Sequence, residues 1–228
     1  MSALYLSRAR LKRDASIESL ARLLLPETKG DRASAGHRLV WSLFAGDADR
    51  RRDFLWRDEG EGRFILLSPE PPAPEHPLLQ VESKPYEPSL AEGDRLNFIL
   101  RANPVISRSE GPGQRGKRHD VVMDALHGIP SGARAEARFD AMQQAGAAWL
   151  ARQGKAHGFE LAAPPVVDGY DRLRLPRPGR AAPAILGVMD FSGLLRITDP
   201  VAFLAAQVNG FGRARGFGFG LMLIRRAL

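Results

Sequence analysis

The pattern of strand and helix signals runs twice through this chain of 228 residues, and this repetition limits the folds open to it. The first unit starts with the alternating segment YLSRARL, continues through a helix capped by Asp14 and a second helix that opens at His37, and ends with three strands. The pattern starts again near Gly93 with a strand, a long helix, further strands, a short helix and a terminal strand. Two successive β–α–β–β units predict an α+β fold made of two tandem ferredoxin-like domains.

The two units are joined near residues 87–92, which gives an N-terminal domain over 1–86 and a C-terminal domain over 93–228. In the first domain FLWRDEGEGRFILLS predicts a hairpin, and PEPPAPEHP predicts a solvated connector. In the second domain we expect one strand over GDRLNFILRANPVIS, a basic loop over EGPGQRGKRHD, and a helix from about Ala133 to Gln153. A short helix with Asp as its cap and Pro at its first position is expected over DPVAFLAAQVNG.

Positive charge is concentrated in two parts of the chain. Residues 1–52 carry 11 Lys and Arg against 6 Asp and Glu, residues 53–100 carry 4 against 10, and residues 101–228 carry 18 against 10. Most of the positive residues are arginine, which suits bidentate contacts with phosphate and stacking on bases. The distribution favours a nucleic-acid partner, although a GC-rich genome that encodes arginine throughout would give the same composition.

The composition also excludes several kinds of site. The chain has no cysteine, which rules out disulfides, cysteine-bound zinc, iron–sulfur clusters and a thiol nucleophile, and which suits the cytoplasm. No histidines have a metal-binding spacing such as H-E-x-x-H, and no G-x-S-x-G elbow is present. No window holds 18 uninterrupted apolar residues, and charges come before any apolar run at the N-terminus. We therefore expect no metal, no small-molecule cofactor and no membrane partner.

The strongest local signal is NGFGRARGFGFG, between the last predicted helix and the last predicted strand. Glycines allow positive φ angles and close approach of a ligand, so the amides of this segment could form an anion-binding nest. The helix-before-strand order excludes a dinucleotide-binding loop, and the lack of Gly-Lys-Ser/Thr excludes a Walker loop. The alternative is a glycine-rich hairpin with buried phenylalanines. The candidate phosphate contacts are Gly210, Gly212, Arg213, Arg215, Gly216, Gly218 and Gly220, with Phe211, Phe217 and Phe219 as stacking faces.

Two other groups of basic residues are candidates for phosphate contact. Arg172 and Arg174 alternate along a predicted strand and therefore share one of its faces, although a solvated edge strand protected by charge would have the same pattern. The second group lies in the basic loop, which could also be a flexible surface loop. The full candidates are Arg172, Arg174, Arg177 and Arg180 in the ribbon, and Arg115, Lys117 and Arg118 in the loop.

His37 is the candidate proton-transfer group. It is expected at the start of the helix HRLVWSLF, after a loop rich in small residues, where an exposed imidazole could donate or accept protons near neutral pH. The other four histidines lie in connectors, in loops or at helix ends. The alternative is that His37 only caps the helix or packs.

Four blocks resemble, in order, the CasE family of CRISPR repeat-processing endoribonucleases: YLSRARL, GHRLVWSLF with FLWR downstream, LNFILRANPVIS with GKRHDVV, and NGFGRARGFGFGLMLI. They extend over nearly the whole chain. The resemblance implies two RNA-recognition-like domains, a CRISPR repeat stem-loop as ligand, and the other subunits of the Cascade complex as partners. It also implies that His37 is catalytic. The RNA 2′-hydroxyl would attack the adjacent phosphorus without a metal and leave a 2′,3′-cyclic phosphate and a 5′-hydroxyl.

One position departs from the family pattern. Some members have a tyrosine three residues before the catalytic histidine, where this chain has Ser34. The second proton-transfer group is therefore open among Ser34, Tyr5 and Lys29, or is absent, and Arg38 is a candidate for phosphate contact. Two other functions stay open, a non-cleaving RNA-binding subunit and a general RNA-binding module of the same fold.

Overall fold

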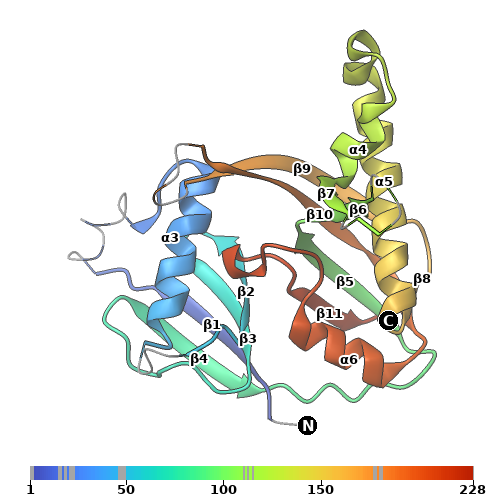
Figure 1. Ribbon diagram of the computed structural model, residues 1–228. Coiled ribbons are helices and arrows are strands. Elements are labelled where there is room, and N and C mark those ends of the chain that lie inside the picture. The colour runs from blue at the N-terminus through green and yellow to red at the C-terminus, as the bar shows by residue number, and fades with distance from the viewer. Residues whose placement is uncertain are drawn as a thin grey trace.

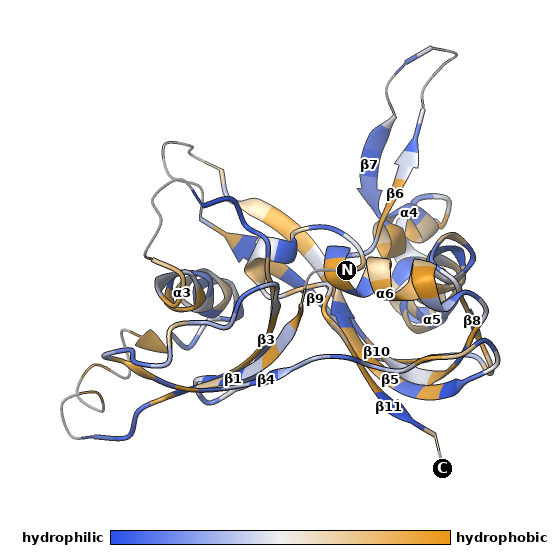
Figure 2. Cartoon of the chain, turned by 90° about the horizontal axis from the view of Figure 1, so that it is seen from below, coloured by the Kyte–Doolittle hydropathy of each residue, from blue (hydrophilic) through white to orange (hydrophobic). Residues whose placement is uncertain are grey.

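The computed structural model contains two main antiparallel sheets, one in each half of the chain (Figure 1). Their helices lie on the same side of the two sheets, as the view from below shows (Figure 2). The structure describes residues 3–14, 17, 20, 24–45, 50–109, 111, 113–114, 116–176, 179 and 182–227.

The N-terminal sheet has the strand order β2-β3-β1-β4. Its strands are β1 (Tyr5–Leu11), β2 (Leu55–Gly60), β3 (Arg63–Ser68) and β4 (Leu79–Pro85), and α3 (Lys29–Ser42) packs on one face. This order is that of a ferredoxin-like domain, but residues 69–78 join β3 to β4 without the second helix of that fold. The core between α3 and the sheet contains Val40, Trp56 and Phe64, which are at most 2% exposed.

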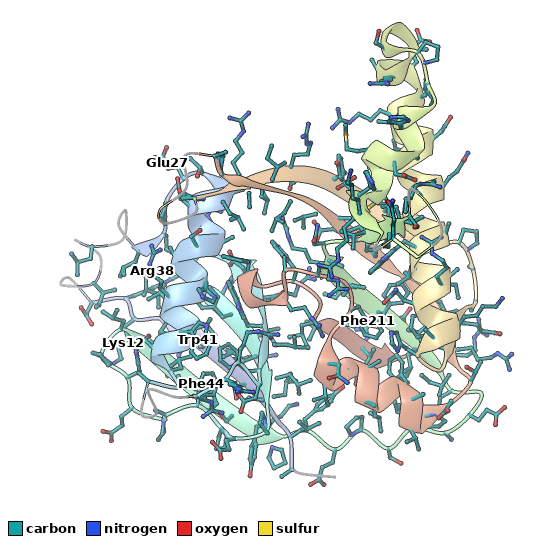
Figure 3. All side chains as sticks on the ribbon, viewed as in Figure 1. Lys12, Glu27, Arg38, Trp41, Phe44 and Phe211 are labelled. Atoms are coloured by element: carbon teal, nitrogen blue, oxygen red, sulfur yellow. The ribbon has the colours of Figure 1, made fainter. Side chains whose placement is uncertain are left out.

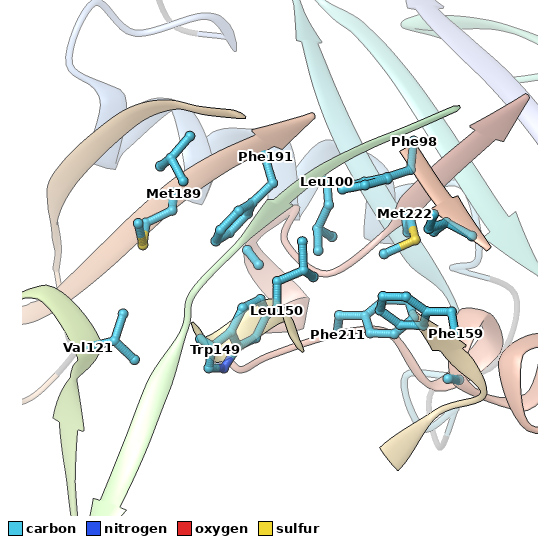
Figure 4. Packing of buried hydrophobic residues seen from close by; sticks show 14 of the residues in the cluster. Phe98, Leu100, Val121, Trp149, Leu150, Phe159, Met189, Phe191, Phe211 and Met222 are labelled. Carbon is cyan, nitrogen blue, oxygen red and sulfur yellow. The ribbon is translucent and has the colours of Figure 1, made fainter. Parts of the chain in front are cut away.

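The C-terminal sheet repeats the order, with β11 next to β5, β5 next to β10, and both β8 and β9 paired with β10. The strands are β5 (Arg95–Ala102), β8 (Phe159–Leu161), β9 (Val166–Leu175), β10 (Ala184–Ile197) and β11 (Met222–Arg226). The helices are α4 (Val121–His127), α5 (Arg134–Ala156) and α6 (Pro200–Asn209), with short 3₁₀ turns η1 (Ser131–Ala133) and η2 (Arg215–Phe217). Figure 4 shows Trp149 of α5 packed against Phe191 of the sheet.

These two sheets confirm the predicted α+β class with two ferredoxin-like units. The predicted hairpin is β2–β3, whose turn has positive φ at Gly60, Glu61 and Gly62. Asp199 caps α6, since its carboxylate accepts from the amides of Val201 and Ala202. The domain boundary near residues 87–92 stays a prediction.

One predicted strand is wrong. GDRLNFILRANPVIS forms two strands in different sheets, because β5 ends at Ala102 and β6 (Val105–Arg108) begins after Pro104. Proline has no amide hydrogen to donate to a ladder, so the run is interrupted there. The last four residues of the expected basic loop form β7 (Lys117–Asp120), which pairs with β6 in a hairpin that projects from α4 and α5 (Figure 2).

The predicted start of the His37 helix is also wrong. Helix α3 begins at Lys29, so His37 lies in its interior. Thr28 is the N-cap, and its hydroxyl oxygen accepts from the amide of Asp31 at 3.2 Å. A Cβ on Gly30 would lie 2.1 Å from the Arg174 carbonyl oxygen, so this glycine permits close packing and does not break the helix.

The helix expected after Asp14 falls largely outside the described residues. The Asp14 carboxylate accepts from the Ile17 amide at 2.9 Å, as a helix cap would.

Candidate active site

Helix α3, which carries His37, contacts η2 of the glycine-rich segment that follows α6, and η2 also contacts β2 (Figure 1). The Nδ1 atom of His37 lies 2.7 Å from the carbonyl oxygen of Gly216. A carbonyl only accepts hydrogen bonds, so this contact requires the proton on Nδ1. In the neutral ring Nε2 then carries the free lone pair, which is the nitrogen available for proton transfer.

Trp56 of β2 donates to the same carbonyl. Its indole Nε1 lies 2.9 Å from the Gly216 oxygen, and its side chain is fully buried. A Cβ on Gly36 would lie 2.7 Å from the Trp56 ring, and one on Gly218 would lie 2.9 Å from it. The indole therefore packs directly under the residue before His37 and under the glycine-rich segment, and it joins α3, β2 and η2.

Aromatic rings border the imidazole. The Phe217 ring centroid lies 5.3 Å from that of His37 at an angle of 31°, and the Trp41 centroid lies 6.1 Å away, edge-on. Figure 3 shows Trp41 on the same helix, α3. These contacts fix the plane of the ring, so Nε2 has a defined direction.

Among the described residues, none of the proposed second proton-transfer groups shares a hydrogen bond with His37. The Ser34 hydroxyl donates to the Gly30 carbonyl at 3.1 Å within the helix. Lys29 lies eight residues earlier, about 12 Å along the axis, and its Nζ contacts both Asp171 carboxylate oxygens at 2.8 Å. Tyr5 shares no hydrogen bond or ring contact with His37 among the described residues. Arg38 is exposed on α3 beside His37.

The glycine-rich segment has the backbone that the sequence predicts. Four of its glycines have positive φ, between 77° and 90°. A Cβ on any of these four would lie 2.6–2.9 Å from a protein atom, whereas at Gly216 the nearest atom is 3.7 Å away. Internal packing thus accounts for Gly210, Gly212, Gly218 and Gly220. Whether any of these glycines contacts RNA stays a prediction.

The prediction that Phe211 and Phe219 offer stacking faces is wrong. Phe211 is fully buried and Phe219 is 3% exposed, because both side chains fill the core beneath the segment. Figure 4 shows Phe211 beside Phe159 in this core. Phe217 is half-buried and packs on His37.

Arg52 and Arg215 add positive charge near His37. Burial first, and then the charge of Arg215, lower the pKa of the Arg52 guanidinium, while Asp53 opposes the shift. Arg213 is exposed in the same segment.

The other basic candidates lie on exposed surface. Arg172 and Arg174 are exposed on β9 while Leu173 and Leu175 are buried, which confirms that the two arginines share a strand face. Lys117 and Arg118 are exposed on β7. Arg115, Arg177 and Arg180 lie outside the described residues.

Within the described ranges no group of three or more His, Asp or Glu residues could hold a metal ion. No helix in that part of the chain is long and apolar enough to cross a membrane.

Sequence reasoning missed Trp56, Arg52 and the carbonyl of Gly216. A backbone carbonyl has no sequence signal, and Trp56 reads as a core residue of a strand. The run ADRRRD marks Arg52 only as one of three adjacent arginines.

The family model described as CRISPR associated protein matches residues 4–226. The CRISPR-associated endoribonuclease Cse3 of Thermus thermophilus is 28% identical over 62% of this chain and 60% of its own length. The CRISPR system Cascade subunit CasE of Escherichia coli is 28% identical over 82% of this chain and 88% of its own. Among solved structures, Cse3 bound to a 19-nucleotide RNA has a TM-score of 0.67 at 22% identity, covering 98% of this chain and 99% of that one. Cas6e of E. coli has a TM-score of 0.62 at 22% identity, covering 98% and 100%.

Proposed function

We propose that this chain, which belongs to the CRISPR-associated protein family, is an endoribonuclease that binds CRISPR repeat RNA and cleaves the precursor. We also propose that it stays bound to the other Cascade subunits after cleavage. The relatives named as an endoribonuclease and as a Cascade subunit support this activity and these partners. The observation that carries it is the imidazole of His37, whose Nδ1 is held by Gly216 so that Nε2 is left for chemistry. Such a complex would act in the cytoplasm.

The reaction needs only a few groups. The RNA 2′-hydroxyl attacks the adjacent phosphorus in line, the 5′ oxygen leaves with a proton, and the products are a 2′,3′-cyclic phosphate and a 5′-hydroxyl. Nε2 of His37 either removes the proton from the 2′-hydroxyl or supplies the proton to the leaving oxygen. The Gly216 carbonyl keeps the other ring nitrogen protonated in either role.

A second protein group for proton transfer has little support. The hydroxyl of Ser34 and the ammonium of Lys29 are both engaged elsewhere, by Gly30 and Asp171. We therefore propose that His37 works without a second side chain from this set, and that the substrate or water completes the proton balance.

A single-turnover assay tests the activity. The chain is mixed in excess with a labelled repeat stem-loop and, separately, with an unrelated hairpin of the same length. We expect one cut in the repeat RNA and a 5′-hydroxyl on the downstream product. If the repeat binds tightly and is never cut, the chain is a non-cleaving subunit. If both hairpins bind equally, it is a general RNA-binding module.

We expect cleavage to proceed unimpaired in excess EDTA, because the RNA supplies the nucleophile and the described residues lack a group of metal ligands. The rate is measured with and without chelator at a fixed monovalent salt concentration that keeps the stem folded. A rate that falls with EDTA and returns with Mg²⁺, while the stem stays folded, would contradict the mechanism.

We expect Arg172→Gln combined with Arg174→Gln to weaken RNA binding. Both guanidiniums lie on one exposed face of β9, where they could follow the backbone of a stem. Losing two phosphate contacts should lower the slope of log affinity against log salt by roughly 1.4–1.8. The matched control removes two other exposed strand arginines of the same sheet, Arg95 and Arg225. Equal slopes for the two double variants would mean that β9 has no special role.

A further inference from the structure

Arg52 and Arg215 meet beside His37 from opposite halves of the chain. The Cδ atom of Arg52 lies 3.8 Å from the point that a Cβ on Gly216 would occupy, and Cε1 of His37 lies 3.7 Å from that point. Arg52 and the imidazole thus flank the same small space. Arg215 directly precedes Gly216, and both arginines line a cavity of about 940 Å³ that also borders Asn209, Asp53 and Glu87.

Neither arginine has a carboxylate partner among the described residues. Nη1 of Arg52 donates to the Phe54 carbonyl at 2.6 Å, and Nη1 of Arg215 donates to the carbonyls of Asn209 and Gly210. The neighbouring carboxylate of Asp53 is bound by Arg50 at 2.9 Å. Carbonyl oxygens satisfy donors without cancelling charge, and the nearby Asp53 carboxylate is shared with Arg50, so the positive charge of these two half-buried groups is only partly compensated.

The other basic cavity near the site is different. A cavity of about 390 Å³ on the far side of Phe217 is lined by Lys29, Arg57 and Arg101, among others. Each of these has an acidic partner, since Asp171 contacts Lys29 and Arg101, and Glu59 contacts Arg57. Arg32 also lines this cavity and donates to the carbonyls of Pro26 and Glu27, whereas Asp58 and Glu59 lie in the lining itself, so most of the positive charge here is paired within the protein.

We infer that Arg52 and Arg215 bind one phosphodiester group of the RNA, the one at or next to the bond that is cut. This inference rests on the proposed function. A phosphodiester carries the negative charge and the oxygen acceptors that the two guanidiniums lack. The point beside Arg52 that a Cβ on Gly216 would occupy lies 3.7 Å from Cε1 and 3.8 Å from Nδ1 of His37, so a phosphate held by Arg52 lies beside the imidazole. Arg52 would then offset the charge that develops on the phosphate oxygens.

The test compares Arg52→Gln with Arg51→Gln, which removes the same charge from the adjacent, exposed arginine. Cleavage is measured in single turnover on the repeat RNA. The cut site is first mapped with the wild type. Binding is then measured at several salt concentrations on the same RNA, with a 2′-deoxy sugar placed at that site. We expect Arg52→Gln to cleave at least about tenfold more slowly and to lower the salt slope by roughly 0.7–0.9, the value for one phosphate contact. Arg51→Gln should change the rate by less than about threefold.

A methylphosphonate placed at single linkages identifies the phosphate, because it removes one charge. At the linkage held by Arg52, the methylphosphonate should weaken RNA binding by the wild type and leave RNA binding by Arg52→Gln unchanged. Melting temperatures verify that each variant is folded, and glutamine keeps an amide that can donate to Phe54. If Arg52→Gln matches Arg51→Gln in rate and slope while the wild type cleaves, the inference is overturned. If the wild type binds without cleaving, the proposed activity fails, and the slope and methylphosphonate data still decide the arginine site.

Discussion

His37→Ala is expected to slow single-turnover cleavage by at least about 10²-fold, because general acid–base catalysis is worth on the order of 10²–10⁴ in rate. The imidazole makes one hydrogen bond among the described residues, to the Gly216 carbonyl, and leaves only Nε2 for the substrate. RNA affinity should therefore change by less than about tenfold, or roughly 1.4 kcal/mol. Both quantities are measured on the same repeat RNA.

The matched control is His127→Ala, which removes an exposed histidine at the end of α4. It should cleave at the wild-type rate. A His37→Ala chain that cuts normally would remove His37 from the reaction. One that neither folds nor binds would make His37 a structural residue, since its ring also packs on Phe217.

Much of the fold follows from local sequence signals. The β2–β3 hairpin is set by a turn with two glycines around Glu61, and α6 is set by Asp199 at the cap with Pro200 after it. Such signals act over a few residues, so they can be read without knowing the rest of the fold.

Long-range packing explains the features of the fold that local sequence signals could not predict. Gly30 and Gly36 resemble helix breakers in the sequence, yet α3 passes through both, because Gly30 lies against the Arg174 backbone and Gly36 against the Trp56 ring. Tertiary packing therefore overrides the low helix propensity of glycine at these positions.

In the candidate site, too, some features follow from the local sequence and others depend on long-range packing. The residue type of His37 marks it as a proton-transfer group, but its orientation depends on Gly216, 179 residues later in the chain. The donor that shares this carbonyl, Trp56, is 160 residues away from it. Neither contact could be predicted from spacing, because residues from the two halves of the chain have to come together before the carbonyl meets the imidazole.

Trp56→Ala is expected to destabilise the chain by roughly 3–5 kcal/mol, the usual cost of removing a large buried aromatic side chain. The indole is fully buried, and it contacts Phe64 as well as the positions of Gly36 and Gly218. Chemical denaturation measures this loss. Trp149→Ala, at a second tryptophan that is 3% exposed, should cost a similar amount and thus reports packing alone.

Trp56→Phe separates the hydrogen bond from the packing. Phenylalanine keeps most of the buried ring but removes the Nε1 donor, so the Gly216 carbonyl is held only by His37 and can turn away. We expect cleavage to fall at least about tenfold, whereas Trp149→Phe should lose stability and cleave within about threefold of the wild type. The ring-nitrogen chemical shifts of ¹⁵N-labelled His37 provide the decisive measurement. The wild type should carry its proton on Nδ1 in the neutral ring, and Trp56→Phe should carry part of it on Nε2. Identical shifts in the two proteins, together with equal rates for the two phenylalanine variants, would reduce Trp56 to a packing residue.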